Sequence, residues 1–183
     1  MKILENKAIC LILMLVLIVG GFLLGGYKGL AGQYQKVEDV FFLGEEGDGI
    51  CVANDMAERA SALTNMQTVA QKYLAAGDSA LKASSASLND YTRAVGDIRA
   101  LFAANSRMDS AMAGLYQAME GKALSDKDEN YRQRLYADFN SRNDTISHDP
   151  YYKYAADYNG ILMHFPANLI AGMTPAKTAA ITR

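Results

Sequence analysis

The chain has 183 residues, enough for one domain and an anchor and too few for two ordinary domains. Its formal net charge of −2 at pH 7 argues against a nucleic-acid-binding protein, which needs a basic surface to neutralise phosphates. With only three prolines and abundant Ala, Leu and Met, the composition favours long helices over sheets. Cys10 and Cys51 are the two cysteines, and such a pair predicts neither a disulfide framework nor a metal site.

An uncharged apolar stretch lies close to the N-terminus. Residues 8–26 read AICLILMLVLIVGGFLLGG, about the ~20 residues that a helix needs to cross a hydrocarbon core of ~30 Å. We therefore expect residues 1–26 to form a retained transmembrane anchor. A cleaved signal peptide is the alternative, but its apolar core is normally only ~7–15 residues long. The sequence offers only Gly29-x-Ala31 as a cleavage site.

Basic residues on either side of this span indicate its orientation. Lys2 and Lys7 precede it together with the α-amino group, whereas Lys28 and Lys36 follow it, close to a run of acidic residues. The positive-inside rule therefore favours a single-pass protein with a cytoplasmic N-terminus and an extracytoplasmic C-terminal bulk. Cys51 is expected to be the one exposed thiol, suitable for testing this orientation.

Helical periodicity continues beyond the anchor. Apolar side chains recur every three or four residues and predict one rod over about residues 4–43. Its apolar face consists of Tyr27, Leu30, Tyr34, Val37 and Phe41. The glycine-rich segment 44–50 ends this helix. Because the segment lacks the ligand spacing of an EF-hand loop, we expect a solvated turn there and no calcium site.

Two further helices are predicted before residue 120. One covers about residues 52–76 and ends at Gly77-Asp78, where Asp78 or Ser79 can cap its successor. The next is predicted as one continuous helix because apolar residues keep a helical spacing throughout it. These residues are Leu81, Leu88, Tyr91, Val95, Ile98, Leu101, Met108, Met112, Leu115 and Met119. Methionines are expected to fill irregular gaps in the core.

The last helical stretch is predicted to contain a break. A helix capped by Ser125 runs toward Pro150, which a helix interior would tolerate only at about 3 kcal/mol. Asp149 as a cap, with proline at the first helical position, predicts a new helix. Its core residues are expected to be Tyr151, Tyr154 and Tyr158. The predicted fold is all-α, with an N-terminal transmembrane helix continuing into an antiparallel up-and-down bundle of about four long helices.

The C-terminal stretch DYNGILMHFPANLIAGM, residues 157–173, resembles the signature of the bacterial LemA family. In that signature a tyrosine-bearing helix ends in Tyr-Asn, followed by Phe-Pro and an Asn-Leu-x-Ala-Gly run. The matching residues are Tyr158, Asn159, Phe165, Pro166, Asn168, Leu169, Ala171 and Gly172, with Tyr151 matching an earlier tyrosine. After the anchor, Gly26, Tyr27, Leu30, Val37 and Glu38 resemble the family's opening, whereas Thr64-Asn65 replaces its usual Pro-Asn pair. The resemblance implies a LemA-like helical bundle over residues 27–173.

The signature is interpreted as a structural lock. Asn159 is expected to bond to nearby backbone, and Phe165 to pack back onto the bundle. Pro166 turns the chain out of the helix, after which residues 168–170 place an apolar pair over the bundle end. Residues 174–183 have nothing to bury and are expected to be a mobile tail. A binding surface is the alternative role for the signature.

Residues suited to catalysis are sparse. His148 and His164 are the only histidines, and neither has a second ligand at helical spacing, so no metal site is predicted. The sequence lacks Glu-x-x-His pairs, phosphate-binding glycine loops and nucleophile elbows. Carboxylates occur singly and are expected on solvated faces; examples are Asp97, Asp109, Glu120, Asp138 and Asp144. We therefore expect no enzyme and no cofactor.

These observations favour a non-catalytic scaffold or adaptor anchored in a bacterial cell membrane, as the resemblance implies. Its bundle would contact a partner protein or further copies of the chain. Gly21 and Gly25 form one small-x-x-x-small spacing that favours self-association of the span. The alternative is an extracytoplasmic bundle that senses a small ligand and signals through a separate membrane partner. The resemblance to LemA-like proteins implies no settled biochemical activity.

Overall fold

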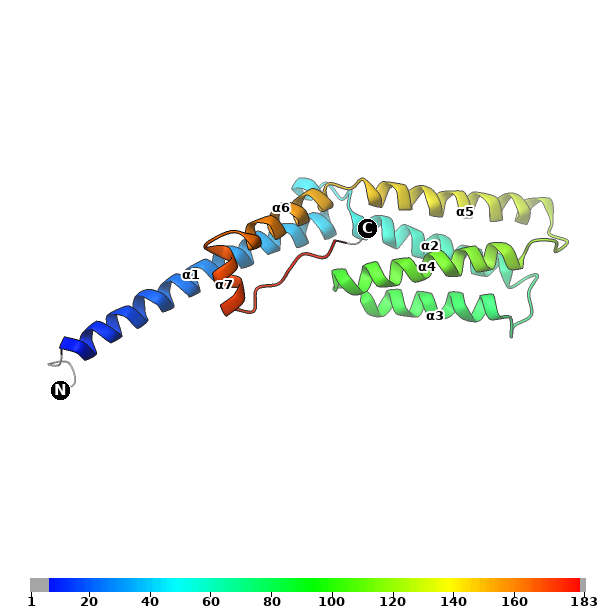
Figure 1. Ribbon diagram of the computed structural model, residues 1–183. Helices are drawn as coiled ribbons and strands as arrows, with labels where there is room; N and C mark the ends of the chain where they lie inside the picture. The colour runs from blue at the N-terminus through cyan, green and yellow to red at the C-terminus, as the bar shows by residue number, and fades with distance from the viewer. Residues whose placement is uncertain (1–6, 182–183) are drawn as a thin grey trace. The chain divides into compact units, whose positions relative to one another are not determined.

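The computed structural model describes residues 7–181, which form helices joined by turns (Figure 1). The elements are α1 (Lys7–Leu43), the 3₁₀ turn η1 (Glu45–Gly47), α2 (Val52–Ala70), α3 (Ser79–Ala94), α4 (Ile98–Ala118), α5 (Asp126–Ser147), α6 (Tyr151–Met163) and α7 (Ala167–Met173). No strand occurs among these residues, so the all-α class is confirmed. The first residues of the predicted anchor and rod, 1–6, lie outside the described part of the chain.

The chain forms two compact units. One combines the residues up to Glu38 with Lys153–Ile181, and the other contains Asp39–Tyr152. The unit boundaries fall inside α1 and α6, so each of these helices contributes to both cores. The division of the sequence at residues 26 and 173 stays a prediction.

Helix α1 meets the length and composition of a membrane-crossing helix, and its most apolar window has no buried residue. Farther along the same helix, Leu30, Val37 and Phe41 are buried as the periodicity predicts. The apolar first half and the amphipathic second half of α1 therefore have different surroundings. Proteins place an apolar face against other apolar groups. The second half of α1 has such groups around it, whereas most large side chains of the first half are exposed.

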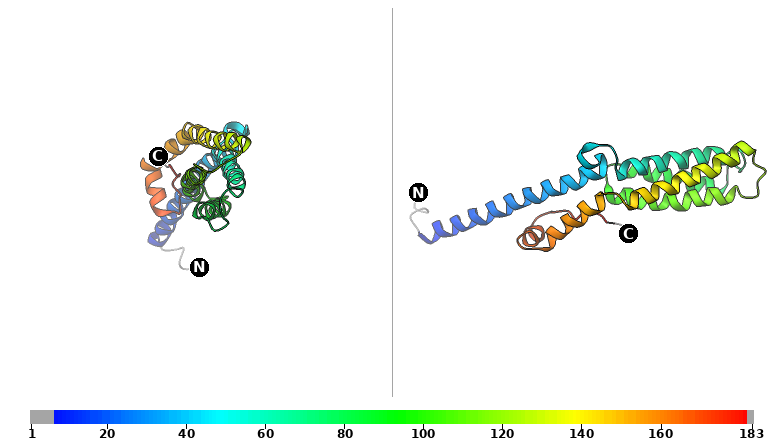
Figure 2. Two further views of the ribbon diagram at one scale, coloured as in Figure 1. Left: turned by 90° about the vertical axis from the view of Figure 1, so that its right-hand side faces the viewer. Right: turned by 90° about the horizontal axis from the view of Figure 1, so that it is seen from above.

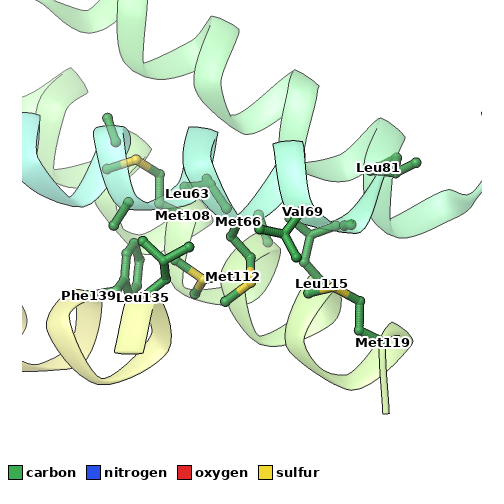
Figure 3. Packing of buried hydrophobic residues seen from close by; sticks show 14 of the residues in the cluster. Leu63, Met66, Val69, Leu81, Met108, Met112, Leu115, Met119, Leu135 and Phe139 are labelled. Atoms are coloured by element: carbon green, nitrogen blue, oxygen red, sulfur yellow. The ribbon is translucent and has the colours of Figure 1, made fainter. Parts of the chain in front are cut away.

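In the second unit, α2 packs against α3, α4 and α5, and α3 packs against α4. Figure 2 shows these helices end-on and from above. Methionines fill the space between α2, α4 and α5 (Figure 3), and Met66, Met108 and Met112 are completely buried. The expectation of a methionine-filled core is confirmed. Unbranched methionine side chains suit such a core because they adapt to irregular gaps between helices.

The helix predicted to continue to Met119 is in fact two helices, α3 and α4. Gly96 has a φ of +95°, in the left-handed region that glycine adopts without a Cβ penalty. Asp97 then caps α4 by accepting a hydrogen bond from the Ala100 N–H at 2.9 Å. The chain reverses here, which lets α3 pack against α4. Val95 kept the helical spacing in the sequence but lies in the turn and is 66% exposed.

The predicted caps and restart are confirmed. Ser125 Oγ accepts a hydrogen bond from the Asp128 N–H at 3.2 Å, and Asp149 Oδ1 accepts one from the Tyr151 N–H at 2.8 Å. Tyr151 is fully buried, with its ring 5.0 Å from the Phe41 ring. In contrast, α2 ends at Ala70, before the predicted residue 76.

In the first unit the chain bends at Pro166 as predicted and then forms α7, a short helix that the sequence did not predict. A proline is tolerated where a helix begins because no intrahelical N–H is needed there. Ile170 and Ala167 are buried against Leu30 of α1, whereas Leu169 is 48% exposed, so the apolar pair expected at residues 168–170 is only half buried. The expected packing of Phe165 is also wrong, because this side chain is 79% exposed.

Candidate functional site

A small cavity in the first unit brings together residues from three segments that are distant in the sequence. It has a volume of about 200 Å³ and is referred to below as the tyrosine pocket. Its lining residues are Tyr27, Ala31, Tyr34 and Gln35 from α1, Tyr158 from α6, and Pro175, Ala176 and Lys177 from the C-terminal segment. Tyr27 and Tyr158, two of the signature residues, thus share one cavity.

Aromatic and cationic contacts shape the tyrosine pocket. The rings of Tyr34 and Tyr158 lie 5.6 Å apart, and Lys177 Nζ is 5.5 Å from the centre of the Tyr34 ring. The second distance permits a cation–π attraction. Burial, followed by the neighbouring Tyr27, raises the pKa of Tyr158. The phenol therefore stays protonated at neutral pH, and its hydroxyl donates a 2.9 Å hydrogen bond to the Lys177 carbonyl.

Asn159 holds the C-terminal segment against α6. Its Nδ2 donates to the Ala179 carbonyl at 3.0 Å, and its Oδ1 accepts from the Ala179 N–H at 2.9 Å. This side chain therefore satisfies both backbone groups of one residue. Ala179 is only 6% exposed, so the expectation that the C-terminal segment has nothing to bury is wrong for this residue. Asn159 bonds to distant backbone, not to the local backbone expected from its position near a helix end.

The remaining signature residues are dispersed. Leu30 is buried against α7, and Tyr151 belongs to the core of the other unit. The others are exposed: Phe165, Pro166, Asn168, Leu169 and Gly172. Tyr154, expected in the core, is 37% exposed. The signature thus combines buried packing positions with a group of exposed ones, and its functional role stays a prediction.

A buried arginine forms the main polar site of the second unit, and the sequence did not reveal it. Arg59 is fully buried on α2, and its Nε donates to the Phe139 carbonyl at 3.2 Å. Its two terminal nitrogens donate to Asn105 Oδ1 and Asp109 Oδ1. The guanidinium also lies over the Phe139 ring, 3.9 Å from its centre. Burial lowers the pKa of Arg59, and the Asp109 carboxylate opposes this effect.

One signal in the sequence could have identified Arg59. It occupies the apolar stripe of α2, three residues after Met56 and four before Leu63, both of which are fully buried. A charged residue at such a position needs buried partners. Which residues would serve as partners could not be predicted, since Asn105 and Asp109 lie on α4, far along the chain.

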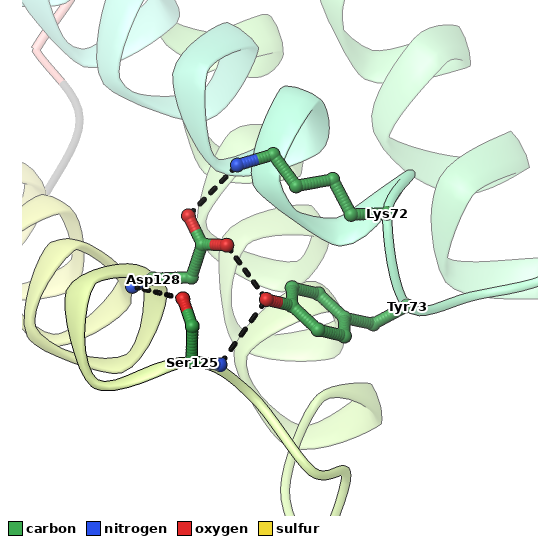
Figure 4. Close-up of polar contacts among 4 residues, drawn as sticks. All are labelled: Lys72, Tyr73, Ser125 and Asp128. Atoms are coloured by element: carbon green, nitrogen blue, oxygen red, sulfur yellow. Dashed lines mark hydrogen bonds and ion pairs between the residues drawn. The ribbon is translucent and has the colours of Figure 1, made fainter.

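Asp128 at the start of α5 is the centre of a second polar cluster (Figure 4). Lys72 Nζ lies 2.8 Å from one of its oxygens, and the Tyr73 hydroxyl donates to the other at 2.6 Å. The Tyr73 oxygen accepts in turn from the Ser125 N–H at 3.2 Å. The hydrogen bonds from Lys72 and then Tyr73 lower the pKa of Asp128. The cluster joins the turn after α2 to the N-terminal cap of α5, and its hydrogen bonds link these two segments.

Two open grooves lie on the second unit. One, between α2 and α5, has a volume of about 570 Å³ and polar walls that include Glu58, Asn65, Asp138 and Arg142. The other, between α2 and α3, has a volume of about 560 Å³ and includes Gln67, Gln71 and Asn89. Both volumes are in the ~300–1,000 Å³ range of small-molecule sites, although such sites are usually mostly apolar.

Residues with possible metal or thiol chemistry are separated from one another. Cys51 is only 3% exposed, and its Sγ donates to the Phe42 carbonyl at 3.3 Å, so the expectation of an exposed thiol is wrong. His148 and His164 are exposed at helix ends, as expected. Among residues 7–181, no group of three or more His, Cys, Asp or Glu side chains is arranged to hold a metal ion.

Comparisons with known proteins identify no relative. No protein-family model, no curated protein and no solved structure matches the chain significantly.

Proposed function

We propose that this protein is a membrane-anchored, non-catalytic scaffold or adaptor of the LemA type. In this proposal, residues 8–26 cross a bacterial cell membrane once, with the N-terminus in the cytoplasm. The helices outside the membrane form an up-and-down bundle that contacts a partner protein or further copies of the chain. The LemA assignment rests on the residues of the C-terminal signature and of the segment after the anchor.

The observation that carries the proposal is the uncovered apolar half of α1. Large side chains from Leu11 to Leu24 are exposed, for example Leu17 at 76% and Ile18 at 62%. Burying such a side chain fully is worth about 1.5–3 kcal/mol, so a helix with this many exposed ones is unfavourable in water. A bilayer covers them without further protein, and a helix satisfies its own backbone hydrogen bonds there.

The interior of the second unit supports a scaffold. Its buried charges and amides are engaged by other protein groups, as Arg59 and Asp128 show, and its apolar core is filled by methionine and leucine. Short turns between consecutive helices favour antiparallel neighbours, which supports the up-and-down arrangement. These features support the proposal of a rigid body that presents surfaces to a partner.

A second candidate function is supported by the grooves on the second unit. A small polar solute could bind in the groove between α2 and α5, where Glu58 and Arg142 form an ion pair at its wall. The protein would then be an extracytoplasmic sensor that signals through a membrane partner.

The anchor is tested by membrane fractionation of cells that express the full chain. Replacing Val16 and Leu17 by arginine should move the protein from the carbonate-resistant membrane pellet to the soluble fraction, because charge at the centre of a span opposes insertion. Val95→Arg is the matched control, since the 66% exposure of Val95 lies between those of Val16 and Leu17 but Val95 belongs to the other unit. Retention of the double variant in the membrane would refute the anchor.

The orientation is tested with an impermeant maleimide on a chain whose native thiols are removed. Cys51→Ser retains a hydrogen-bond donor to the Phe42 carbonyl, and Cys10→Ser removes the second thiol. In this background Ile50→Cys, at a position 68% exposed, should be labelled in intact cells. Lys7→Cys should be labelled only after lysis. The reverse pattern would place the bundle in the cytoplasm.

The scaffold role is tested by crosslinking in cells followed by extraction in mild detergent. Recovery of one or two envelope proteins, or of the chain itself, in a fixed ratio is the expected result. Recovery of an uncrosslinked monomer would refute the scaffold and leave the sensor, to be tested by a small-molecule screen on the full chain. A self-association through the span should weaken in Gly21→Ile, because a Cβ at position 21 meets no other atom within 4 Å in the monomer and the bulk would act on a neighbouring span.

A further inference from the structure

Five large apolar side chains are exposed on α6, in the turn that follows it and on α7. The exposed fractions are 79% for Phe165, 78% for Met163, 61% for Met173, 48% for Leu169 and 44% for Ile161. We call these five residues the interfacial patch. Single exposed apolar residues are ordinary, whereas a group of them marks an interaction surface.

The sequence around the interfacial patch is uncharged. From Tyr158 to Ala176 it contains no Asp, Glu, Lys or Arg, whereas Asp157 and Lys177 flank it on either side. A water-facing helix surface normally alternates charged and apolar residues. An uncharged stretch of this length fits an environment in which charges are unfavourable.

Contacts within the first unit fix the position of the patch along α1. The Tyr158 ring packs against Tyr34, while Ile170 packs against Leu30 and its side chain faces Gly26. From Tyr158 to Ile170, the chain therefore follows α1 back toward its apolar half (Figure 1). Gly26 is the last residue of that half. The interfacial patch thus lies beside the point where the apolar span ends.

The length of the span places this point relative to a bilayer. Residues 8–26 extend about 28 Å at 1.5 Å per residue, close to the ~30 Å thickness of a hydrocarbon core. If these residues span the membrane, Gly26 lies at the boundary between acyl chains and headgroups. Helix α7, which packs at Gly26, lies in the same layer. Helices that lie in the membrane plane bury their apolar face about 5–10 Å into the boundary between headgroups and acyl chains.

We propose that the interfacial patch is a second membrane contact, inserted at the acyl-chain boundary of the bilayer that α1 crosses. This inference rests on the proposed anchoring of residues 8–26. A lipid surface suits the patch better than a protein partner because α7 packs on α1 at the end of its apolar half and the patch has no charged residue within it. Lys28, exposed two residues beyond Gly26, is placed to meet lipid phosphates.

The test uses tryptophan fluorescence, which is specific here because the chain has no native tryptophan. Full-length single-tryptophan variants are reconstituted in phosphatidylcholine vesicles with or without bromine atoms on the acyl chains. Phe165→Trp and Leu169→Trp report on the interfacial patch. Leu15→Trp reports on the span, and Val95→Trp, at an exposed site of the second unit, is the control outside the membrane. Circular dichroism confirms that each variant is folded.

We expect brominated lipid to reduce the fluorescence of the two patch variants to an extent comparable with Leu15→Trp, and to leave Val95→Trp unchanged. Quenching at Leu15 without quenching at either patch site would overturn the inference while the anchor stands. A blue-shifted but unquenched signal at Phe165 would also overturn it and indicate a protein or a second copy as the occupant. Quenching at the patch but not at Leu15 would support the lipid contact and refute the span. Absence of quenching at the patch and at Leu15 would refute both the lipid contact and the span.

Discussion

Removing the Arg59 side chain tests whether the buried guanidinium stabilises the second unit. Arg59→Ala would leave the Asn105 amide oxygen without its donor at a site only 7% exposed, and would remove one donor from the Phe139 carbonyl. An orphaned buried acceptor costs about 1–3 kcal/mol. The loss at the Phe139 carbonyl is at the low end of this range. This carbonyl lies within α5, and its second lone pair can accept the hydrogen bond of the helix.

The other contributions to the loss of stability in Arg59→Ala are smaller. The Asp109 side chain is 46% exposed, so water replaces its lost partner at little cost. Loss of the stacking on Phe139 adds about 1 kcal/mol. We therefore expect Arg59→Ala to lower the free energy of unfolding by roughly 3–5 kcal/mol in total. Arg59→Met retains most of the side-chain volume and should recover part of this loss.

The assay is urea unfolding of the full chain in non-ionic detergent, followed by circular dichroism at a helix band. Arg107→Ala is the matched control, because Arg107 is 61% exposed and its ion pair with Asp90 lies on the surface. An exposed pair of this kind is worth about 0–1 kcal/mol. A loss for Arg59→Ala no larger than that for Arg107→Ala would refute the reasoning that the buried network stabilises the core.

Three further predictions concern the C-terminal segment, a carboxylate and two glycines. Asn159→Ala removes both hydrogen bonds to Ala179, each worth about 0.5–1.5 kcal/mol, so amide exchange there should accelerate by about 5- to 150-fold in hydrogen-exchange mass spectrometry. Asp128→Asn should lower the urea midpoint at pH 7 and flatten its dependence below about pH 4. The reason is that hydrogen bonds lower the pKa of Asp128 from 3.8, so its stabilisation is present above that value and lost as the pH falls through the lowered one. In thermal unfolding, Gly96→Ala should destabilise by about 1–2 kcal/mol because its φ is +95°. Gly114→Ala, in a helix with open space at the Cβ, should stabilise by about 0.4–1 kcal/mol.

Each of these predictions has an outcome that contradicts it. Unchanged exchange in Asn159→Ala would mean that the C-terminal segment is held by other contacts. An unaltered acid dependence in Asp128→Asn would show that the carboxylate does not titrate with folding. Equal effects of the two glycine substitutions would contradict the assignment of Gly96 to a turn that requires a positive φ.

The sequence by itself determined the helical class, the apolar half of α1, the glycine-rich turn and the caps at Ser125 and Asp149. These features depend on periodicity and on bonds between residues two to four apart, so local sequence contains the information. The break at Gly96 was missed for a related reason: apolar residues keep a helical spacing on both sides of it, and spacing alone does not reveal a positive φ.

Only the tertiary structure decided the partners of Arg59, the attachment of Ala179 to Asn159 and the packing of Ile170 on Gly26. Each of these contacts joins segments that are distant along the chain. Such a contact depends on how complete helices pack, and no local pattern specifies it. The exposure of Phe165 follows the same principle: its apolar character was visible in the sequence, but whether a core covers it depends on where α6 ends and α7 begins.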